Sequence, residues 1–188
     1  MNNGLIAARY ATALLDYANQ SDSSDRVYIE AKAVVQSYSQ FSELRSVLDN
    51  PVLGNDEKRK IIITAAGGNV SLPFERFINL LWENNREVQL HAIMLKYIEL
   101  FRNQHNIHSG KLTTAAAVNP SIEKRLVTMM EKQTGGTVEL EKIIDPAILG
   151  GFLFEVDFIR WDASLSGQLK RIREEFIEQN KRILSIYN

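Results

Sequence analysis

Apolar residues recur at helical spacing throughout the first half of the chain. In the first twenty residues they cover much of the helix circumference, which predicts a helix buried on more than one side. Five more helical segments follow: one after the Ser/Asp cluster at 21–25, one at 41–48, one from Asn55 to Gly67, one opened by Ser71 and Pro73, and one over 87–104. The Ser/Asp cluster and Asn55 are suitable N-caps. Because the linkers are short, residues 4–105 predict a six-helix bundle.

The pattern changes at the polar, turn-rich segment 103–110, and we place a domain boundary there, between 1–105 and 106–188. The second part predicts a strand at 111–118, a helix from Pro120 to the Gly135-Gly136 pair, a half-exposed strand at 137–143 and a hairpin over 150–162. The predicted fold is therefore mainly α, with an N-terminal six-helix bundle followed by a small α+β domain.

A final helix is predicted over residues 163–185, with a length of about 33 Å. Its apolar residues form one stripe opposite charged residues: Leu165, Leu169, Ile172, Phe176 and Ile183. Amphipathic helices usually face a core, so one interpretation packs this helix on its own sheet. In the other, the stripe or the far end near Ile183 and Tyr187 holds another protein.

Composition and charge exclude several classes of function. The chain has 188 residues, of which 45% are hydrophobic and 24% charged, with a formal net charge of -1. Neither half carries the basic excess that binding to nucleic acid requires. The longest apolar runs are interrupted by Lys96 or Glu155 well before membrane-spanning length, so no direct insertion is expected. The absence of cysteine excludes a disulfide framework and a thiol nucleophile.

No catalytic, cofactor-binding or metal-binding residues are predicted. The glycine pairs lack the lysine of a phosphate-binding loop. His105 and His108 are not accompanied by the further ligands of a zinc site, and we expect both to be exposed in a linker. Asp145, Asp157 and Asp162 could act as a carboxylate pair in a hydrolase. Each borders a turn or a helix start, where aspartate accepts hydrogen bonds from nearby backbone N–H groups, so a structural role is expected.

The first helix is rich in alanine, with five alanines in the twelve residues "AARYATALLDYA". Small side chains allow close helix approach and leave a shallow apolar groove. The fifth helix could form the second wall with its apolar stripe: Phe74, Phe77, Ile78 and Leu81. This arrangement suits a helix-in-groove contact with a partner. The alternative is a tightly packed bundle interior.

Four segments in order resemble one family: "ARYATALLDYA", "LDNPVLGNDEKRKII", "LLWENNREVQLHAIMLKYIELF" and "DPAILGGFLFEVDFIRWDASLSGQL". Together they are similar to the delta subunit of F-type ATP synthases, whose mitochondrial counterpart is the oligomycin sensitivity-conferring protein. The resemblance covers essentially the whole chain.

The resemblance implies a non-catalytic stator subunit of a proton- or sodium-driven ATP synthase. In that family the N-terminal bundle grips the N-terminal segment of an alpha subunit between its first and fifth helices, and the C-terminal domain holds a b-type stalk. The implied location is peripheral, on the cytoplasmic face of the bacterial cell membrane, without cofactor or nucleic acid. The implied head-binding residues are Ala7, Tyr10, Ala11, Leu14, Phe74, Phe77, Ile78 and Leu81.

Two substitutions test the implied head contact. Phe77→Asp or Ala11→Trp is expected to abolish binding of the alpha-subunit segment while the fold remains. The alternative is a generic helical-bundle interaction scaffold unrelated to ATP synthase, which would have a different partner.

Two departures from the family pattern fall near the final hairpin. Asp157-Phe158 stands where the family commonly has Gly-Asp, and we expect Asp157 to adopt the left-handed turn conformation. Asp162-Ala163-Ser164 replaces Asp-Gly-Ser, and Ser166 and Gln168 occupy positions that are commonly arginine-rich. The resemblance therefore implies a less electrostatic contact with the stalk at this point.

Overall fold

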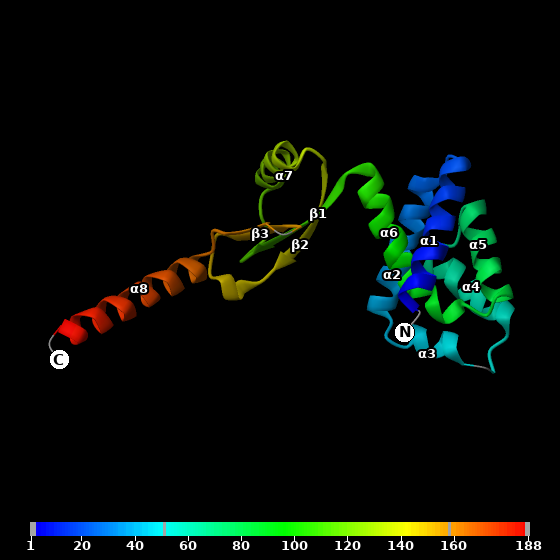
Figure 1. Ribbon diagram of the computed structural model, residues 1–188, viewed down its shortest axis with the longest axis horizontal. Coiled ribbons are helices and arrows are strands. Elements are labelled where there is room, and N and C mark those ends of the chain that lie inside the picture. The colour runs from blue at the N-terminus through cyan, green and yellow to red at the C-terminus, as the bar shows by residue number, and fades with distance from the viewer. Residues whose placement is uncertain (1–2, 51, 158, 187–188) are drawn as a thin grey trace. The chain divides into compact units, whose positions relative to one another are not determined.

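The computed structural model describes residues 3–50, 52–157 and 159–186, and the chain divides into two compact units, Met1–His105 and Asn106–Asn188. The protein is mostly helical, with one small sheet in the second unit (Figure 1). The described helices of the first unit are α1 (Asn3–Gln20), α2 (Ser24–Gln40), α3 (Leu44–Asp49), α4 (Asn55–Ala65), α5 (Leu72–Glu83), the short 3-10 helix η1 (Glu87–Gln89) and α6 (Leu90–His105).

Helix α6 is the central element of the first unit. Its most extensive contacts are with α1 and α2. Its inward face is fully buried and includes Ile93, Tyr97 and Phe101. The ring of Phe101 stacks on Tyr28 of α2 at a centroid distance of 4.2 Å. This apolar and aromatic burial is the main stabilising contribution to the unit.

The helix starts differ in part from the sequence prediction. Ser71 caps α5 as expected, because its hydroxyl oxygen accepts a hydrogen bond from the Phe74 N–H at 3.4 Å. The proposed cap at Asn55 is wrong: Asn55 is the first residue of α4, and Gly54 occupies the N-cap position. Ser23 precedes α2 without a side-chain cap, because its hydroxyl donates to the carbonyl of Ser21 instead.

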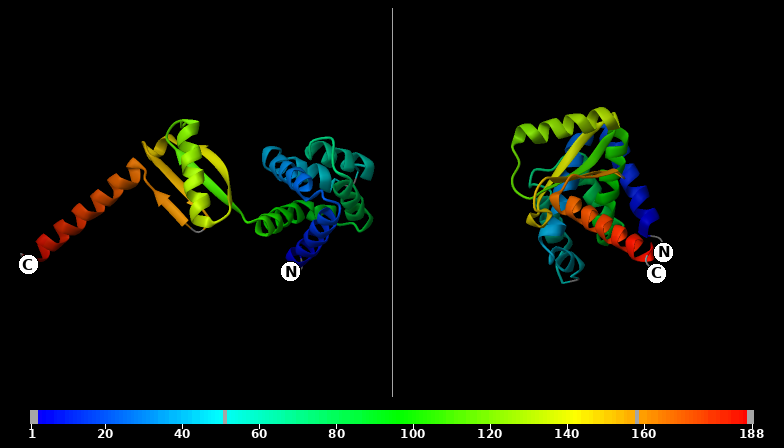
Figure 2. Two further views of the ribbon diagram at one scale, coloured as in Figure 1. Left: turned by 90° about the horizontal axis from the view of Figure 1, so that it is seen from above. Right: turned by 90° about the vertical axis from the view of Figure 1, so that its left-hand side faces the viewer.

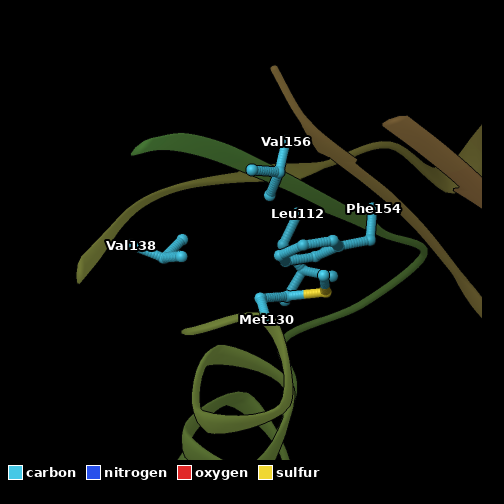
Figure 3. Packing of buried hydrophobic residues seen from close by; sticks show 5 residues of the cluster. All are labelled: Leu112, Met130, Val138, Phe154 and Val156. Atoms are coloured by element: carbon cyan, nitrogen blue, oxygen red, sulfur yellow. The ribbon is translucent and has the colours of Figure 1, made fainter. Parts of the chain in front are cut away.

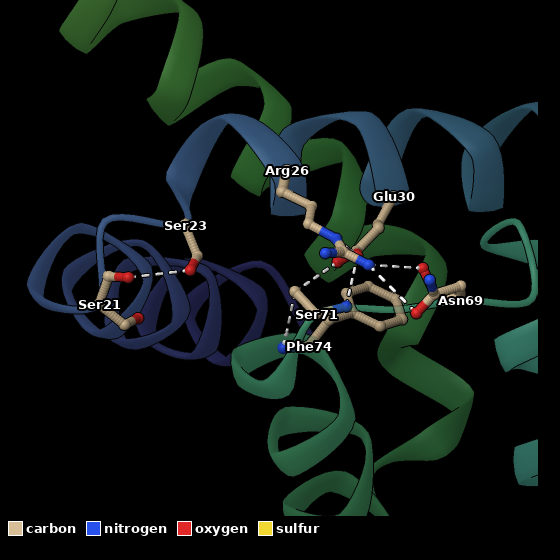
Figure 4. A network of polar contacts seen from close by, with 7 residues as sticks. All are labelled: Ser21, Ser23, Arg26, Glu30, Asn69, Ser71 and Phe74. Atoms are coloured by element: carbon tan, nitrogen blue, oxygen red, sulfur yellow. Dashed lines mark hydrogen bonds and ion pairs between the residues drawn. The ribbon is translucent and has the colours of Figure 1, made fainter.

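A buried glutamate links α2 to the start of α5 (Figure 4). The Glu30 carboxylate is 3% exposed and accepts hydrogen bonds from the Ser71 N–H at 2.5 Å and the Ser71 hydroxyl at 2.7 Å. Arg26 lies 3.4 Å from the same carboxylate and also donates to the backbone and side chain of Asn69. A buried carboxylate is tolerated only when it is paired in this way. The network therefore fixes the entry of α5 against α2.

His91 gives the first unit a pH-dependent stability. It lies against Tyr38 of α2, with ring centroids 4.6 Å apart. Burial, followed by the Arg45 guanidinium, lowers the pKa of His91 below its ordinary value. Since the unfolded chain then binds the proton first as the pH falls, stability is retained above the unfolded pKa of about 6.5 and is lost below it.

We therefore expect the urea midpoint of this unit to drop between about pH 7.5 and about pH 5. The drop should be smaller in His91→Phe, which keeps a ring without a titrating group. His105→Phe is the control, because phenylalanine can keep the stacking of this exposed ring on Phe101 at a centroid distance of 4.0 Å, and its drop should equal that of the wild type. An equal drop in wild type and His91→Phe contradicts this assignment.

The second unit contains a four-stranded sheet in the order β2-β1-β3-β4. Its elements are β1 (Ile107–Thr114), α7 (Pro120–Thr134), β2 (Thr137–Ile144), the short 3-10 helix η2 (Pro146–Ile148), β3 (Phe152–Val156), β4 (Ile159–Asp162) and α8 (Leu165–Ile186). Strand β1 pairs parallel with β2 and antiparallel with β3, while β3 and β4 form an antiparallel hairpin.

The first strand begins earlier than the sequence predicts. It covers 107–114 rather than 111–118, because its parallel pairing with β2 starts at Ile107↔Thr137 and ends at Thr114↔Ile144. Residues beyond Thr114 have no partner in β2 and lead into α7. The prediction of a polar linker over 103–110 is also wrong. Helix α6 reaches His105 and β1 starts at Ile107, so only Asn106, whose φ is 52°, separates them.

Helix α7 lies across one face of the sheet (Figure 2). Met130 points from α7 onto the sheet and completes a core made from three strands (Figure 3). The buried members of this core are Leu112, Met130, Val138, Phe154 and Val156. The opposite face carries polar residues such as Lys111, Glu139 and Glu155, as expected for a mixed sheet packed on one side.

Candidate docking surfaces

The predicted groove residues of α1 and α5 lie mostly inside the first unit. All are buried except Tyr10, which is half-buried: Ala7, Ala11, Leu14, Phe74, Phe77, Ile78 and Leu81 are each at most 5% exposed. Helix α1 makes its most extensive contact with α6, not α5. The buried alanines therefore belong to a closely packed helix interface, as in the interior-packing alternative. They do not form an open groove floor in the described structure.

An exposed seam between α1 and α5 lies beside these buried residues. Tyr10 meets Phe77 edge to face at a centroid distance of 6.3 Å. The guanidinium of Arg76 donates a hydrogen bond to the Tyr17 hydroxyl at 2.7 Å. An apolar side chain remains exposed beside these contacts, Leu80 of α5. We call the set Tyr10, Tyr17, Arg76 and Leu80 the α1/α5 seam.

Sequence reasoning missed Leu80 as a surface residue. The stripe Phe74, Phe77, Ile78 and Leu81 uses the dominant helical period of α5 and is the buried face. Leu80 falls outside that stripe and is 44% exposed. An apolar residue off the main stripe was therefore the available signal for the exposed face.

Helix α8 carries a second unpartnered apolar surface. Its main contact is with η2, and the described stripe Leu165, Leu169, Ile172 and Phe176 is exposed. The expectation that α8 packs on its own sheet is therefore wrong: the helix contacts mainly η2, and these four side chains stay exposed. Tyr187 lies outside the described residues, and the side chain of Ile183 is also not described.

The start of α8 is firmly anchored. The Asp162 carboxylate accepts hydrogen bonds from the Ser164 N–H at 3.0 Å and the Ser164 hydroxyl at 2.5 Å. The hydrogen bond from the Ser164 hydroxyl, followed by the one from the Ser164 N–H, lowers the pKa of the Asp162 carboxyl below its ordinary value. Leu165 N–H donates to the Gly150 carbonyl at 3.0 Å, which ties the helix to the residues before β3. The exposed stripe is thus held by a defined strand-to-helix junction.

The three candidate catalytic aspartates have structural roles. Asp145 accepts from the Ala147 N–H at 2.9 Å and caps η2, and Asp162 accepts hydrogen bonds from Ser164, whose hydroxyl oxygen in turn accepts from the Gly167 N–H at 3.0 Å and caps α8. Asp157 adopts the expected left-handed conformation with φ 50°, while its neighbour Phe158 lies outside the described residues. Its carboxylate lies 2.6 Å from His108 Nδ1. The expectation that both histidines are exposed in a linker therefore fails for His108, which is half-buried at the start of β1.

The described ranges contain neither a candidate metal site nor a candidate membrane span. Among residues 3–50, 52–157 and 159–186, no group of three or more His, Asp or Glu side chains could hold a metal ion. None of the helices in the described part of the chain combines the length and the apolar character needed to cross a membrane. The arrangement offers apolar surfaces on each unit, which is the geometry of an adaptor.

Comparisons with known proteins identify the family. Residues 6–176 match the family described as "ATP synthase delta (OSCP) subunit". A protein named ATP synthase subunit delta from Phocaeicola vulgatus is 44% identical over 182 residues, covering 96% of this chain and 98% of that protein. A second, from Bacteroides thetaiotaomicron, is 40% identical over 186 residues, covering 98% of this chain and 100% of that protein.

A solved structure shares the fold. A chain of the Toxoplasma gondii mitochondrial ATP synthase hexamer, determined by cryo-EM, superposes with a TM-score of 0.65 at 18% identity, covering 91% of this chain and 97% of that chain. At this identity the likeness concerns the fold. The family match and the relatives are independent of it.

Two compact units that each expose apolar side chains are typical of a protein that works within a larger assembly, and the family match makes it a non-catalytic subunit. The chain belongs to the ATP synthase delta (OSCP) subunit family. It is therefore a stator component of the stalk of a rotary ATP synthase, a membrane-bound complex, and its partners are other subunits of that complex. A scaffold unrelated to ATP synthase is no longer a viable alternative.

Proposed function

We propose that this chain links the catalytic head of a bacterial F-type ATP synthase to its peripheral stalk, so that the head resists rotation during ATP synthesis. Residues 1–105, as a six-helix bundle, bind the N-terminal segment of an alpha subunit, and residues 106–188 bind a b-type stalk subunit. The chain works at the cytoplasmic face of the cell membrane, held there through the complex. The observation that carries this proposal is that each compact unit has its own unpartnered apolar surface.

The α1/α5 seam is the proposed head-binding surface. Exposed Leu80 and half-buried Tyr10 supply apolar contacts, and burying them against an amphipathic helix removes apolar area from water, which contributes about 25 cal/mol per Å². The Arg76–Tyr17 hydrogen bond places a cation at the edge of the seam. The buried residues Ala11, Phe77 and Leu81 act indirectly, by fixing the spacing of the two helices.

The α8 stripe is one part of the proposed stalk-binding surface. Leu165, Leu169 and Ile172 repeat at spacings of four and three residues, as in helices that pack along another helix. Charges of both signs flank them, including Lys170 and Glu174, whose charged groups lie 4.0 Å apart. The stripe therefore offers mainly apolar contact to a stalk helix.

Bridging two partners suits a protein without reactive groups. When one unit is bound, the other is held near its own partner at a raised effective concentration. Two contacts of moderate strength then give a link that releases slowly. Such a link is what a stator needs, because torque acts on it during every turnover.

Leu80→Asp tests the head contact. Leu80 is 44% exposed, so the substitution leaves the core intact while placing a charge in the seam. We expect the affinity for a synthetic peptide of the alpha-subunit N-terminal segment from the same organism to fall at least about tenfold, because a desolvated charge opposes apolar docking.

Leu95→Asp is the matched control, since Leu95 lies on α6 and is 47% exposed. It should bind the peptide as wild type does. Isothermal titration calorimetry measures both affinities, and circular dichroism checks the fold. Equal binding by Leu80→Asp and wild type would place the head contact elsewhere, and no binding by wild type would overturn the head end of the proposal.

A further inference from the structure

Helix α7 has a partly exposed apolar stripe beside its core residue Met130, and Leu126 of this stripe also packs against the core. Ile122, Leu126 and Met129 follow one another at i, i+4 and i+7, and Ile122 and Met129 are about half exposed. Together with Ser121, Lys124, Arg125, Thr128 and Lys132 they make up the outer surface of α7. The stripe extends over about 10 Å of the helix, or two turns.

The stripe borders a cleft between α7 and the β3–β4 hairpin. The cleft has a volume of about 300 Å³, and Leu126 and Met129 of the stripe line it. Phe154 and Trp161 line its other side, with ring centroids 6.1 Å apart. A protruding apolar side chain laid along α7 would therefore meet an aromatic wall.

The charge on this surface is positive. Lys124, Arg125 and Lys132 form no ion pair within the described part of the chain. The acidic residues of α7 are engaged on the side of β2, because Glu123 lies 2.5 Å from Lys142 and Glu131 accepts a hydrogen bond from the Val138 N–H at 3.4 Å. The cations therefore stand beside the apolar stripe without local neutralisation.

The carboxylate that lines the cleft already accepts hydrogen bonds from this chain. Asp162 lines the cleft, but one of its oxygens accepts both hydrogen bonds from Ser164 at the start of α8. It does not offset the three cations along α7. We call the set Ile122, Lys124, Arg125, Leu126, Met129 and Lys132 the α7 surface.

We propose that the α7 surface binds an amphipathic helix whose apolar stripe is flanked by acidic side chains, and that the b-type stalk subunit supplies this helix. The inference rests on the stalk contact of the proposed function and assigns it a second surface in addition to α8. The three cations beside a narrow apolar stripe favour a partner helix with an acidic flank and disfavour one with a basic flank, and the stalk contact of the proposed function supplies the subunit. Apolar anchors at i, i+3 or i+4, and i+7 of the partner match the two turns available.

The charge test uses the full chain and the water-soluble part of the b-type stalk subunit from the same organism. In Lys124→Glu/Arg125→Glu we expect the affinity to fall at least about tenfold and its dependence on salt to become shallower, because the long-range attraction is removed. The control is Lys111→Glu/Arg160→Glu, which makes the same charge change outside the α7 surface. It should bind within about twofold of wild type.

The apolar test replaces Met129 with aspartate. Met129 is 54% exposed, and the matched control Ile144→Asp changes a residue of β2 that is 60% exposed. We expect Met129→Asp to bind the stalk fragment at least about tenfold more weakly, with Ile144→Asp unchanged. Sedimentation velocity of the chain alone shows whether either variant alters self-association.

Three results would overturn the proposal. If wild type binds the stalk fragment and both α7 variants bind equally well, the stalk contact stands but does not use this surface. If Met129→Asp alters only self-association of the chain, the occupant is a second copy. If wild type does not bind the stalk fragment at all, the stalk end of the proposed function fails as well, while the alpha-peptide titration still reports on the head end.

Discussion

Phe77→Asp is expected to unfold the first unit, whereas Leu80→Asp, three residues further along the same helix, leaves it folded. Phe77 is 5% exposed and packs against Tyr10. Removing a buried phenylalanine costs about 3 to 5 kcal/mol, and leaving an unpaired carboxylate in its place adds to that. We therefore expect a loss of at least about 4 kcal/mol, which is a large fraction of the stability of a domain.

The two tryptophans allow each unit to be followed separately, since Trp82 lies in α5 and Trp161 in β4. In a Trp161→Phe background, urea unfolding monitored by Trp82 fluorescence reports on the first unit. A cooperative transition at the wild-type midpoint in Phe77→Asp contradicts the burial described above. This outcome matters for the site, because Phe77→Asp can test partner binding only if the unit remains folded.

Gly151→Ala is expected to have the largest effect on the second unit. Gly151 has φ 71°, and a Cβ atom there would overlap the backbone carbonyl of Ala163 and lie 3.2 Å from the Cα of Ser164. The junction between β3 and α8 would have to move. We expect a loss of at least about 3 kcal/mol, made up of left-handed strain of about 1 to 2 kcal/mol and the steric overlap.

Gly135→Ala separates these two contributions. Gly135 ends α7 with φ 73°, but a Cβ atom there meets nothing within 4 Å. It should show the conformational cost alone, about 1 to 2 kcal/mol. Unfolding is followed by Trp161 fluorescence in a Trp82→Phe background. Equal midpoints for the two variants would show that the close approach at Gly151 contributes nothing.

The helices could be predicted because their signal is local. Apolar spacing, the Gly67-Gly68 stop and the Ser71–Pro73 start all lie within one or two turns of the element they define. The predicted bounds of strand β1 were wrong because the ends of a strand depend on its partner strand. Its pairing with β2 stops at Thr114↔Ile144, about thirty residues away along the chain, and no local pattern encodes that limit.

The candidate site could be predicted only to the level of the two helices that form it. Periodicity identifies an apolar face but does not distinguish a face packed on its own core from one awaiting a partner. Phe77 and Leu80 differ in this respect, and only the tertiary contacts of α5 separate them. The conformation of Asp157 followed from its residue type, whereas its pairing with His108 did not, because the two are 49 positions apart.

The central claim is that one chain holds two partners at once. The most direct measurement is size-exclusion chromatography of the purified catalytic head and the water-soluble part of the b-type stalk subunit, with and without this protein. We expect the stalk fragment to elute with the head only when the protein is present, and Leu80→Asp to shift the fragment back to its own elution volume. Elution of the stalk fragment with the head in the absence of the protein, or binding of only one partner in its presence, would contradict the account.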